Sequence, residues 1–342
     1  MGRAYSRSGV GEDLADIQSL GGRLIIYGDI NDPMMNYFNP SIEFIGGELK
    51  IAIRSCNFTT VRHSDWKFLD GGVYSKTDVV YGDVDPDTLG ITNLHKLELE
   101  NAPVKTQIAG LEDVRLFPRK DGMHAIGFEV DRVTPVEYQK SGMAEYLIKG
   151  KKLIYLRTLK KPNENIVEKN WMPANVASDS FEFTYSPTQV WTDGEVIGQA
   201  YDSEIHGGSQ LIKQKDGSYL SIVHNKVRDP QYGMVYDRFV YITYLARHDE
   251  NGLITELSKP FRFGTYENIE FASGMVEHGD DLIISLGVRD SKIALARIKK
   301  DILVDLLQPY NKLNDGTQDP LMVVKRRRQM MRAQRQRIAS RA

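Results

Sequence analysis

The chain has 342 residues, of which 41% are hydrophobic and 26% charged, and its formal net charge is -2. This composition is typical of a globular protein and excludes wholesale disorder. No apolar segment approaches the roughly 18 to 20 residues of a membrane helix, and the N-terminus lacks the apolar core of a signal peptide. We therefore expect a soluble, cytoplasmic protein with no membrane partner.

The cysteine count limits the kinds of covalent and metal site, and the distribution of charge identifies a basic segment. A single cysteine, Cys56, excludes an internal disulfide and a thiolate-rich metal site. Eight basic residues and no acid lie between Lys325 and Arg341, about +8, so the rest of the chain carries about -10. The basic charge is therefore concentrated in a C-terminal tail.

Helical periodicity is scarce along the chain. The best helical candidates are residues 11–20 (GEDLADIQSL), residues 299–308 (KKDILVDLLQ) and the basic tail. Elsewhere, short runs rich in Ile, Val, Tyr and Phe are interrupted by Gly, Asp and Asn, which is typical of strands and turns. The sequence predicts an all-β protein with short helical extensions at both ends.

Five segments share one pattern, in which a polar start leads through a turn to an apolar strand. Their turns read GGE, KDG, SDS, KDG and HGDD, and such Gly and Asp residues are what antiparallel hairpins require. The predicted hairpins are residues 39–55, 112–130, 170–186, 207–225 and 272–288.

Hairpins that recur about every 40 to 70 residues favour a propeller over a sandwich, whose strands recur about every 8 to 12 residues. We expect a five-bladed β-propeller over residues 36–300, an N-terminal extension over 1–35 and a helical, basic tail over 301–342. In a propeller the first strand of each blade lines the central channel, so polar residues at these positions should converge.

The polar residues at or near the hairpins combine carboxylates, cations and amides. This mixture suits a polyhydroxylated or phosphorylated ligand. The candidates are Asn39, Arg54, Glu112, Asp113, Arg115, Lys169, Asn170, His206, His224, Glu270 and Asp290.

One of these segments resembles a known family motif. GLEDVRLF, residues 110–117, is similar to the Gly-x-Glu-Asp-Pro-Arg motif of the five-bladed propellers in glycoside hydrolase family 130, the mannoside phosphorylases and hydrolases, and of the related β-mannosyltransferases. FNPSI with IAIRS, EKNWMP with FTYSPTQV, HGGSQLI with YLSIVH, and EFASGMVEHGDDLIISLGVRDSKIALARI follow in the family's order. The resemblance covers about residues 36–300.

The resemblance implies that Asp113 is the proton donor in an inverting reaction, acting directly or through a sugar hydroxyl. The residues themselves suit this role, because Glu112 and partial burial would raise the pKa of Asp113, although Arg115 would oppose them. In the alternative interpretation, Asp113 and Arg115 form an ion pair at a strand end.

The sequence departs from the family motif at two positions. Val114 replaces the proline, which changes backbone stiffness but leaves the charged residues in place. His206 stands where the phosphorylases carry a phosphate-binding lysine, and histidine is a weaker, pH-dependent cation. This difference favours transfer of a sugar from an activated donor, with Arg54, Arg115, Lys169 and Arg238 as the anion-binding set.

Hydrolysis would require a second carboxylate to activate water. Glu270 and Glu204 are the candidates by placement, although a structural role fits each of them as well. The seven histidines show no metal-binding spacing, and there is no nucleotide-binding or nucleophile motif. We predict no metal or cofactor, and a sugar phosphate or nucleotide sugar as the donor substrate.

The basic tail, VVKRRRQMMRAQRQRIAS, would bind nucleic acid phosphates or an acidic partner, or remain solvated. If it binds DNA, glycosyl transfer onto modified bases becomes conceivable. We predict a carbohydrate-active enzyme that makes or breaks a glycosidic bond, with glycosyl transfer ahead of phosphorolysis and hydrolysis third. The alternative is a non-catalytic propeller that binds carbohydrate or protein.

Overall fold

The computed structural model describes residues 14–28, 34–62, 65–72, 75–129, 141–160, 169–176, 182–186, 189–192, 195–197, 205–228, 239–265 and 267–310. Nearly all regular structure in these residues is β, which confirms the predicted all-β class. Two short helices accompany it there, α1 (Val104–Ala109) and α2 (Lys300–Val304). Neither of them is long enough to cross a membrane.

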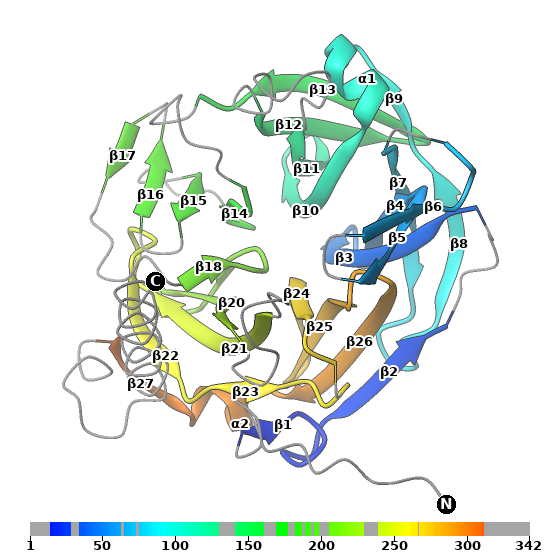
Figure 1. Ribbon diagram of the computed structural model, residues 1–342. Helices are drawn as coiled ribbons and strands as arrows, with labels where there is room; N and C mark the ends of the chain where they lie inside the picture. The colour runs from blue at the N-terminus through cyan, green and yellow to red at the C-terminus, as the bar shows by residue number, and fades with distance from the viewer. Residues whose placement is uncertain are drawn as a thin grey trace, which may run out of the picture.

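Five sheets of four or more strands follow one another around the molecule (Figure 1). The first contains, in order, β3 (Asn36–Ile45), β4 (Glu48–Cys56), β7 (Thr77–Val84) and β8 (Ile91–Lys96). A separate pair consists of β5 (Phe58–Arg62) and β6 (Asp65–Phe68). The second sheet contains β10 (Leu111–Arg119), β11 (Gly122–Glu129), β12 (Gly142–Lys149), β13 (Lys152–Thr158) and β9 (Glu98–Glu100).

The other three sheets complete the ring of Figure 1. The third contains β14 (Met172–Pro173), β15 (Phe183–Ser186), β16 (Gln189–Thr192) and β17 (Glu195–Ile197). The fourth contains β18 (Ile205–Gly207), β19 (Ile212–Lys213), β20 (Tyr219–Arg228), β21 (Phe239–His248), β22 (Ile254–Ser258), β23 (Phe261–Arg262), β1 (Ala15–Asp16) and β27 (Leu307–Pro309). The fifth contains β24 (Glu270–His278), β25 (Asp281–Val288), β26 (Lys292–Lys299) and β2 (Arg23–Tyr27).

The predicted hairpins correspond to paired strands. β3 with β4, β10 with β11, and β24 with β25 are antiparallel neighbours, and β20 pairs with β18 and β19. Gly46 and Gly47 both have positive φ between Ile45 and Glu48, as a two-residue hairpin turn requires. β14 pairs with β15 as expected, while the predicted turn at residues 178–180 lies outside the described residues.

The N-terminal helix expected over residues 11–20 is wrong for its described part. Residues 15–16 form β1, a turn follows, and β2 joins the fifth sheet antiparallel to β26. Ile17, whose apolar side chain suggested a helix face, is fully buried among residues of the fourth and fifth sheets. Long-range packing has overridden the local periodicity.

The C-terminal helix expected over residues 299–308 is shorter than predicted. α2 ends at Val304, and β27 follows and pairs with β22. The basic tail lies outside the described residues, so its binding to nucleic acid or an acidic partner stays a prediction.

The core lies between neighbouring sheets, and β25 shows how the sequence forms it. Successive side chains of a strand point to opposite faces of its sheet. Leu282 and Ile284 pack with the fourth sheet, whereas Ile283 between them packs with the first. Every residue of β25 is therefore buried, which explains its nearly continuous apolar sequence.

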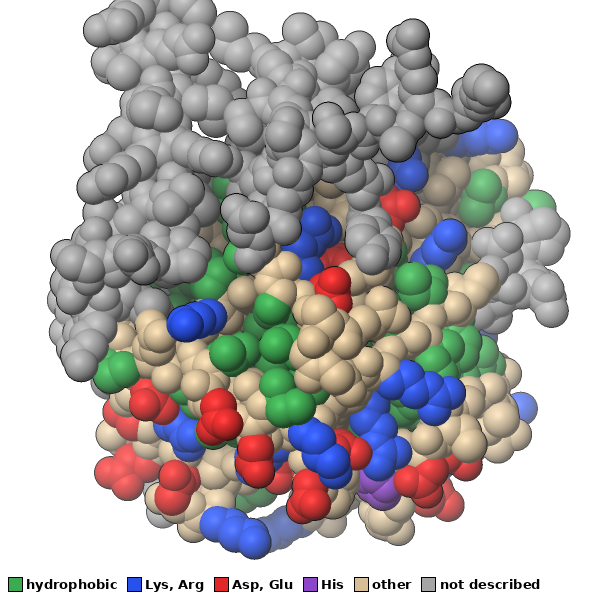
Figure 2. All heavy atoms as spheres, turned by 90° about the horizontal axis from the view of Figure 1, so that it is seen from below, with side chains coloured by type: hydrophobic (Ala, Val, Ile, Leu, Met, Phe, Trp, Pro, Cys, Tyr) green, Lys and Arg blue, Asp and Glu red, His purple; other side chains and the backbone are tan. Residues whose placement is uncertain are grey.

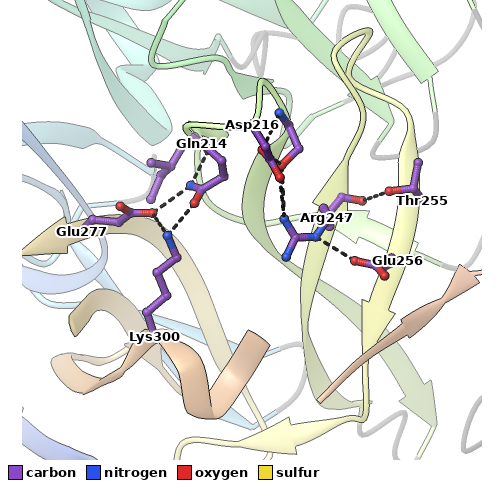
Figure 3. Close-up of polar contacts among 9 residues, drawn as sticks. Gln214, Asp216, Arg247, Thr255, Glu256, Glu277 and Lys300 are labelled. Carbon is purple, nitrogen blue, oxygen red and sulfur yellow. Dashed lines mark hydrogen bonds and ion pairs between the residues drawn. The ribbon is translucent and has the colours of Figure 1, made fainter. Parts of the chain in front are cut away.

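Charged side chains of both signs lie on one side of the molecule (Figure 2). Seen from below, basic and acidic side chains are interleaved over the described part of this side (Figure 2). Polar contacts also link the fourth and fifth sheets, where Lys300 Nζ donates to Gln214 Oε1 at 2.6 Å and to Glu277 Oε1 at 2.9 Å (Figure 3). Such partly exposed contacts each contribute little, about 1 kcal/mol or less, and mainly fix the positions of the two sheets.

A buried histidine predicts how stability depends on pH. His248 is fully buried, its Nε2 lies 2.8 Å from Ser221 Oγ and its Nδ1 lies 2.9 Å from Gly252 O. Burial lowers the pKa of His248 to about 4, whereas an unfolded histidine has a pKa of about 6.5. Between these values the unfolded chain binds more protons, so we expect stability to be full above about pH 6.5 and to fall by about 3 kcal/mol by about pH 4.

Urea unfolding of the wild type and His248→Gln at several pH values would measure this contribution. The variant should lose less free energy of unfolding across that interval, because its buried side chain does not titrate. His278→Gln makes the same change at a more exposed position and should follow the wild type. Equal pH dependence of the wild type and His248→Gln would contradict the prediction.

Candidate functional site

Asp113 lies at an irregularity of β10 that aims its side chain at the neighbouring sheet. Glu112 pairs with Phe128 and Arg115 with Ile126, so Asp113 and Val114 together oppose one residue of β11. This is a β-bulge, which bends a strand and redirects a side chain. The φ of Asp113 is 50°, an uncommon value for a residue other than glycine and one that often marks a functional position.

Asn39 in β3 uses the same device. The register of β3 and β4 shifts between Phe38 and Ser41, and the φ of Asn39 is 48°. Asn39 Nδ2 donates a hydrogen bond of 2.8 Å to Asp113 Oδ1. Two bulges on adjacent sheets therefore bring an amide and a carboxylate together, as expected for residues at the start of the hairpins.

Arg54 pairs with both acids of the second hairpin. Its NH1 lies 3.1 Å from Asp113 Oδ1 and its NH2 lies 2.6 Å from Glu112 Oε1, and all three side chains are buried. Lys169 Nζ adds a longer contact of 3.8 Å to Asp113 Oδ2 while remaining 40% exposed. The desolvation penalty of burying Glu112 and Asp113 is therefore offset by their attraction to these cations.

Arg115 links β10 to residues next to β14 and β18 and to β24. It is fully buried, its Nε donates to Gly208 O at 2.8 Å, its NH1 donates to Asp113 O, and its NH2 donates to Asn170 Oδ1 at 3.3 Å. Its guanidinium also lies 5.1 Å from the centre of the Phe271 ring. Burial lowers the pKa of Arg115 to about 10, so the group remains charged at neutral pH and supports the Asp113 backbone.

The charge state of Asp113 differs from the expectation. Burial alone would raise the pKa of Asp113, but Arg54, Lys169 and Arg115 outweigh burial and hold it below its ordinary value. The predicted increase in pKa due to Glu112 is therefore wrong for the free protein, because the Glu112 carboxylate is paired with Arg54. Asp113 is ionised at neutral pH in this structure.

His206 and His224 lie on adjacent strands beside this cluster. They are paired residues of β18 and β20, with ring centres 5.5 Å apart. His224 stacks on Tyr241 at 4.8 Å and meets the edge of Phe271 at 5.2 Å. Burial, then the positive charges nearby, lowers the pKa of His224 well below its ordinary value, so its ring is neutral.

His224 also has unused hydrogen-bonding capacity. The side chain is 2% exposed, and neither ring nitrogen has a hydrogen-bond partner among the described residues. A buried polar group without a partner is costly, so a ligand oxygen is the natural complement to these nitrogens.

The sequence analysis did not identify two residues that lie beside His224. Lys226 and Tyr241 lie opposite each other on β20 and β21, with Lys226 Nζ 5.3 Å from the centre of the Tyr241 ring. Burial and the charge of Lys169 lower the pKa of Lys226, and the carboxylates of Asp113 and Asp290 oppose this effect. The signal was available, because a residue two positions from His224 in a strand shares its face.

Of the remaining predicted residues, one lies near the cluster, one supports a loop, and two lie outside the described residues. Asp290, on the turn after β25, is partly buried and interacts electrostatically with Asp113 and Arg54. Glu270 is fully buried and accepts hydrogen bonds from Phe263 N and from the backbone and side chain of Thr265, so it supports a loop rather than facing the cluster. Arg238 and Glu204 lie outside the described residues.

The arrangement combines an ionised carboxylate with several cations and neutral hydrogen-bonding groups. Among the described residues, no three His, Cys, Asp or Glu side chains are grouped as metal ligands. The chemistry that this site can perform is proton transfer at Asp113 beside a bound anion.

Comparisons with known proteins identify a family and solved structures of similar fold. A family model described as beta-1,4-mannooligosaccharide phosphorylase matches residues 103–309. A beta-1,2-mannobiose phosphorylase from Listeria innocua, solved with beta-1,2-mannobiose, is 17% identical with a TM-score of 0.55, and the match covers 83% of this chain and 99% of that chain. No curated protein matches the sequence.

Two further solved structures share the fold. A glycosyl hydrolase from Bacteroides ovatus is 15% identical with a TM-score of 0.55, and the match covers 80% of this chain and 85% of that chain. A mannose phosphorylase from Leishmania mexicana, solved with a phosphate ion, is 14% identical with a TM-score of 0.52, and the match covers 82% and 90% of the two chains. At these identities the likeness concerns the fold alone.

Proposed function

The chain belongs to glycoside hydrolase family 130, and we propose that it transfers a mannosyl group between phosphate and a sugar hydroxyl with inversion. The observation that carries this proposal is the buried Asp113 carboxylate surrounded by the charges of Arg54, Lys169 and Lys226. A carboxylate can accept or donate the proton of a sugar hydroxyl, and the cations beside it can hold a phosphate group.

The free protein is suited to the synthetic direction. The acceptor hydroxyl oxygen forms a bond to the anomeric carbon of a sugar 1-phosphate, and its proton passes to Asp113. The bond between that carbon and the phosphate oxygen breaks, and its electron pair leaves with the phosphate. Asp113 is ionised, as this step requires, because only the carboxylate can accept a proton.

Phosphorolysis is the same reaction in reverse, and Asp113 must then carry a proton. Arg54, Lys169 and Arg115 hold the pKa of Asp113 below its ordinary value. A phosphate bound beside these cations would offset their charge, and the pKa of Asp113 would rise. Asp113 would therefore become an effective acid only when phosphate is bound.

We also propose that the five sheets are the blades of a five-bladed propeller. Figure 1 supports this, because the sheets follow one another in a ring with β3, β10, β14, β18 and β24 toward its middle. β3 contacts both β10 and β24, and β2 completes the fifth sheet from the opposite end of the chain. A ring of blades would place the Asp113 cluster at the mouth of a central channel.

Lys226 takes the place of the phosphate-binding lysine that His206 replaces in this chain. It lies on the same face as His224, next to the strand that carries His206. We expect Lys226→Met to raise the KM for phosphate, or for the sugar 1-phosphate, by about 10- to 100-fold, the contribution of one hydrogen bond to a charged group. Steady-state kinetics with phosphate as the varied substrate would measure this change.

The matched control is Lys213→Met. Lys213 is exposed and its Nζ also lies over a tyrosine ring, at 5.8 Å from the centre of Tyr219, so the substitution removes the same interaction at a distance from the site. This control should keep the wild-type KM. An unchanged KM in Lys226→Met would show that the phosphate is held elsewhere.

The proposed function is tested by incubating the purified protein with mannose 1-phosphate, other sugar 1-phosphates or nucleotide sugars, with and without sugar acceptors. Mass spectrometry of the glycoside and release of phosphate that depends on an acceptor would support the proposal. Release of a nucleotide instead would identify a nucleotide-sugar transferase. Cleavage of mannosides without phosphate would identify a hydrolase, and ligand binding without any turnover would indicate a non-catalytic module.

A further inference from the structure

Three carboxylates face the candidate site, and they are paired unequally. Arg54 contacts both Glu112 and Asp113, and Lys169 lies near Asp113. Asp290 has no hydrogen bond or ion pair through its carboxylate in the part of the chain that the structure describes. Arg54 and Lys169 therefore pair with Glu112 and Asp113 and not with Asp290.

The backbone holds Asp290 at the site in an unusual conformation. Asp290 follows β25, and both Arg289 and Asp290 have positive φ, at 53° and 49°. Asn, Asp and Gly are the residues that usually occupy such positions in a turn, so Asp290 is compatible with this conformation. Asn36 Nδ2 donates a hydrogen bond of 2.7 Å to Asp290 O and fixes the turn against β3. The turn therefore holds Asp290 in a fixed place beside β3.

The surroundings of Asp290 come from four strands and one loop. The charged and titratable groups that act on it, or on which it acts, are Arg54 and Cys56 on β4, Asp113 on β10, Lys169 before β14, Lys226 on β20 and Tyr241 on β21. Burial, and then the negative charge of Asp113, raises the pKa of Asp290 above its ordinary value, against the opposing cations.

We propose that Asp290 is a protonated carboxyl of this site, which keeps its proton while Asp113 is ionised and donates a hydrogen bond to a ligand oxygen. The role rests on the proposed function for its ligand. Two carboxyl groups sharing one buried site avoid carrying two negative charges, and the group without a cationic partner is the one that keeps the proton. A protonated Asp290 would also not repel a phosphate held by Lys169 and Lys226.

The protonation of Asp290 can be tested without any substrate. Carbon-13 NMR of protein labelled at aspartate carboxyls should show one carboxyl that titrates above the ordinary range of about 4. This signal should be absent in Asp290→Asn, should titrate at lower pH in Asp113→Asn, and should persist in Asp280→Asn, a control at a turn residue whose side chain is 92% exposed. An Asp290 carboxyl that titrates in or below the ordinary range would overturn the proposal.

The second arm tests the role in turnover. Asparagine resembles a protonated aspartate because it keeps a hydrogen-bond donor at all pH values, whereas alanine has none. The turnover of Asp290→Asn relative to the wild type should rise by at least about threefold across the pH interval in which the Asp290 carboxyl of the wild type loses its proton by NMR. Asp290→Ala should show no such rise. A constant ratio for Asp290→Asn would overturn the role.

The two arms separate this inference from the function on which it rests. A wild-type protein that turns over none of the donors would overturn the proposed function, while the carboxyl titration would still decide the protonation of Asp290.

Discussion

Asp113→Asn is expected to reduce turnover by about 10²- to 10⁴-fold, the usual contribution of a general acid or base. Asparagine is nearly the same size, tolerates the φ of 50°, and keeps an oxygen that can accept the hydrogen bonds from Asn39 and Arg54. The substitution therefore removes the proton-transferring group and the charge while changing the geometry little. The measurement is the initial rate on the donor and acceptor pair identified for the wild type.

Two comparisons make this result specific. Circular dichroism and ligand binding should show that Asp113→Asn remains folded and still binds the sugar. Asp280→Asn makes the same chemical change at an exposed turn and should retain wild-type turnover. A rate within about tenfold of the wild type in Asp113→Asn would contradict the assignment of Asp113 as the proton-transferring group.

Short-range features of the fold could be predicted from the sequence because hairpins are local. Gly46 and Gly47, for example, specify a turn whose strands are adjacent in the chain. The pairing of β2 with β26 could not be predicted in this way, because the two strands lie at opposite ends of the sequence. The leucine and isoleucine spacing before β2 also suggested a helix, since local periodicity does not reveal which neighbour will bury a side chain.

The candidate site was predictable to the extent that residue types specify chemistry. Asn39, Arg54, Glu112, Asp113 and Arg115 were selected because they precede or follow hairpin strands, and the structure brings them into direct contact. Their charge states were not predictable, because the pairing of Arg54 with Glu112 depends on which sheets are neighbours. The structural role of Glu270 was not predictable for the same reason. It depends on hydrogen bonds from Phe263 N and Thr265 N, which the sequence does not place beside it.

Arg115→Met should lower the free energy of unfolding by about 3 to 5 kcal/mol, the cost of breaking a buried charged network. Methionine fills most of the volume but donates no hydrogen bonds. Gly208 O, Asn170 Oδ1 and Asp113 O would each lose a donor where β10 meets the segments next to β14 and β18. The loss is large because the Gly208 and Asp113 carbonyls would stay buried without a replacement from solvent.

Urea unfolding of Arg115→Met should be compared with that of Arg157→Met, the same substitution at an arginine whose side chain is 44% exposed. Arg157 donates to two carboxylates, Glu145 at 2.7 Å and Glu182 at 2.8 Å, so the control removes guanidinium hydrogen bonds at a more exposed position. Water can replace the contacts of Arg157, and its loss should cost about 1 kcal/mol or less. Equal losses in the two variants would mean that burial does not strengthen the contacts of Arg115, and that the Asp113 backbone is held by other interactions.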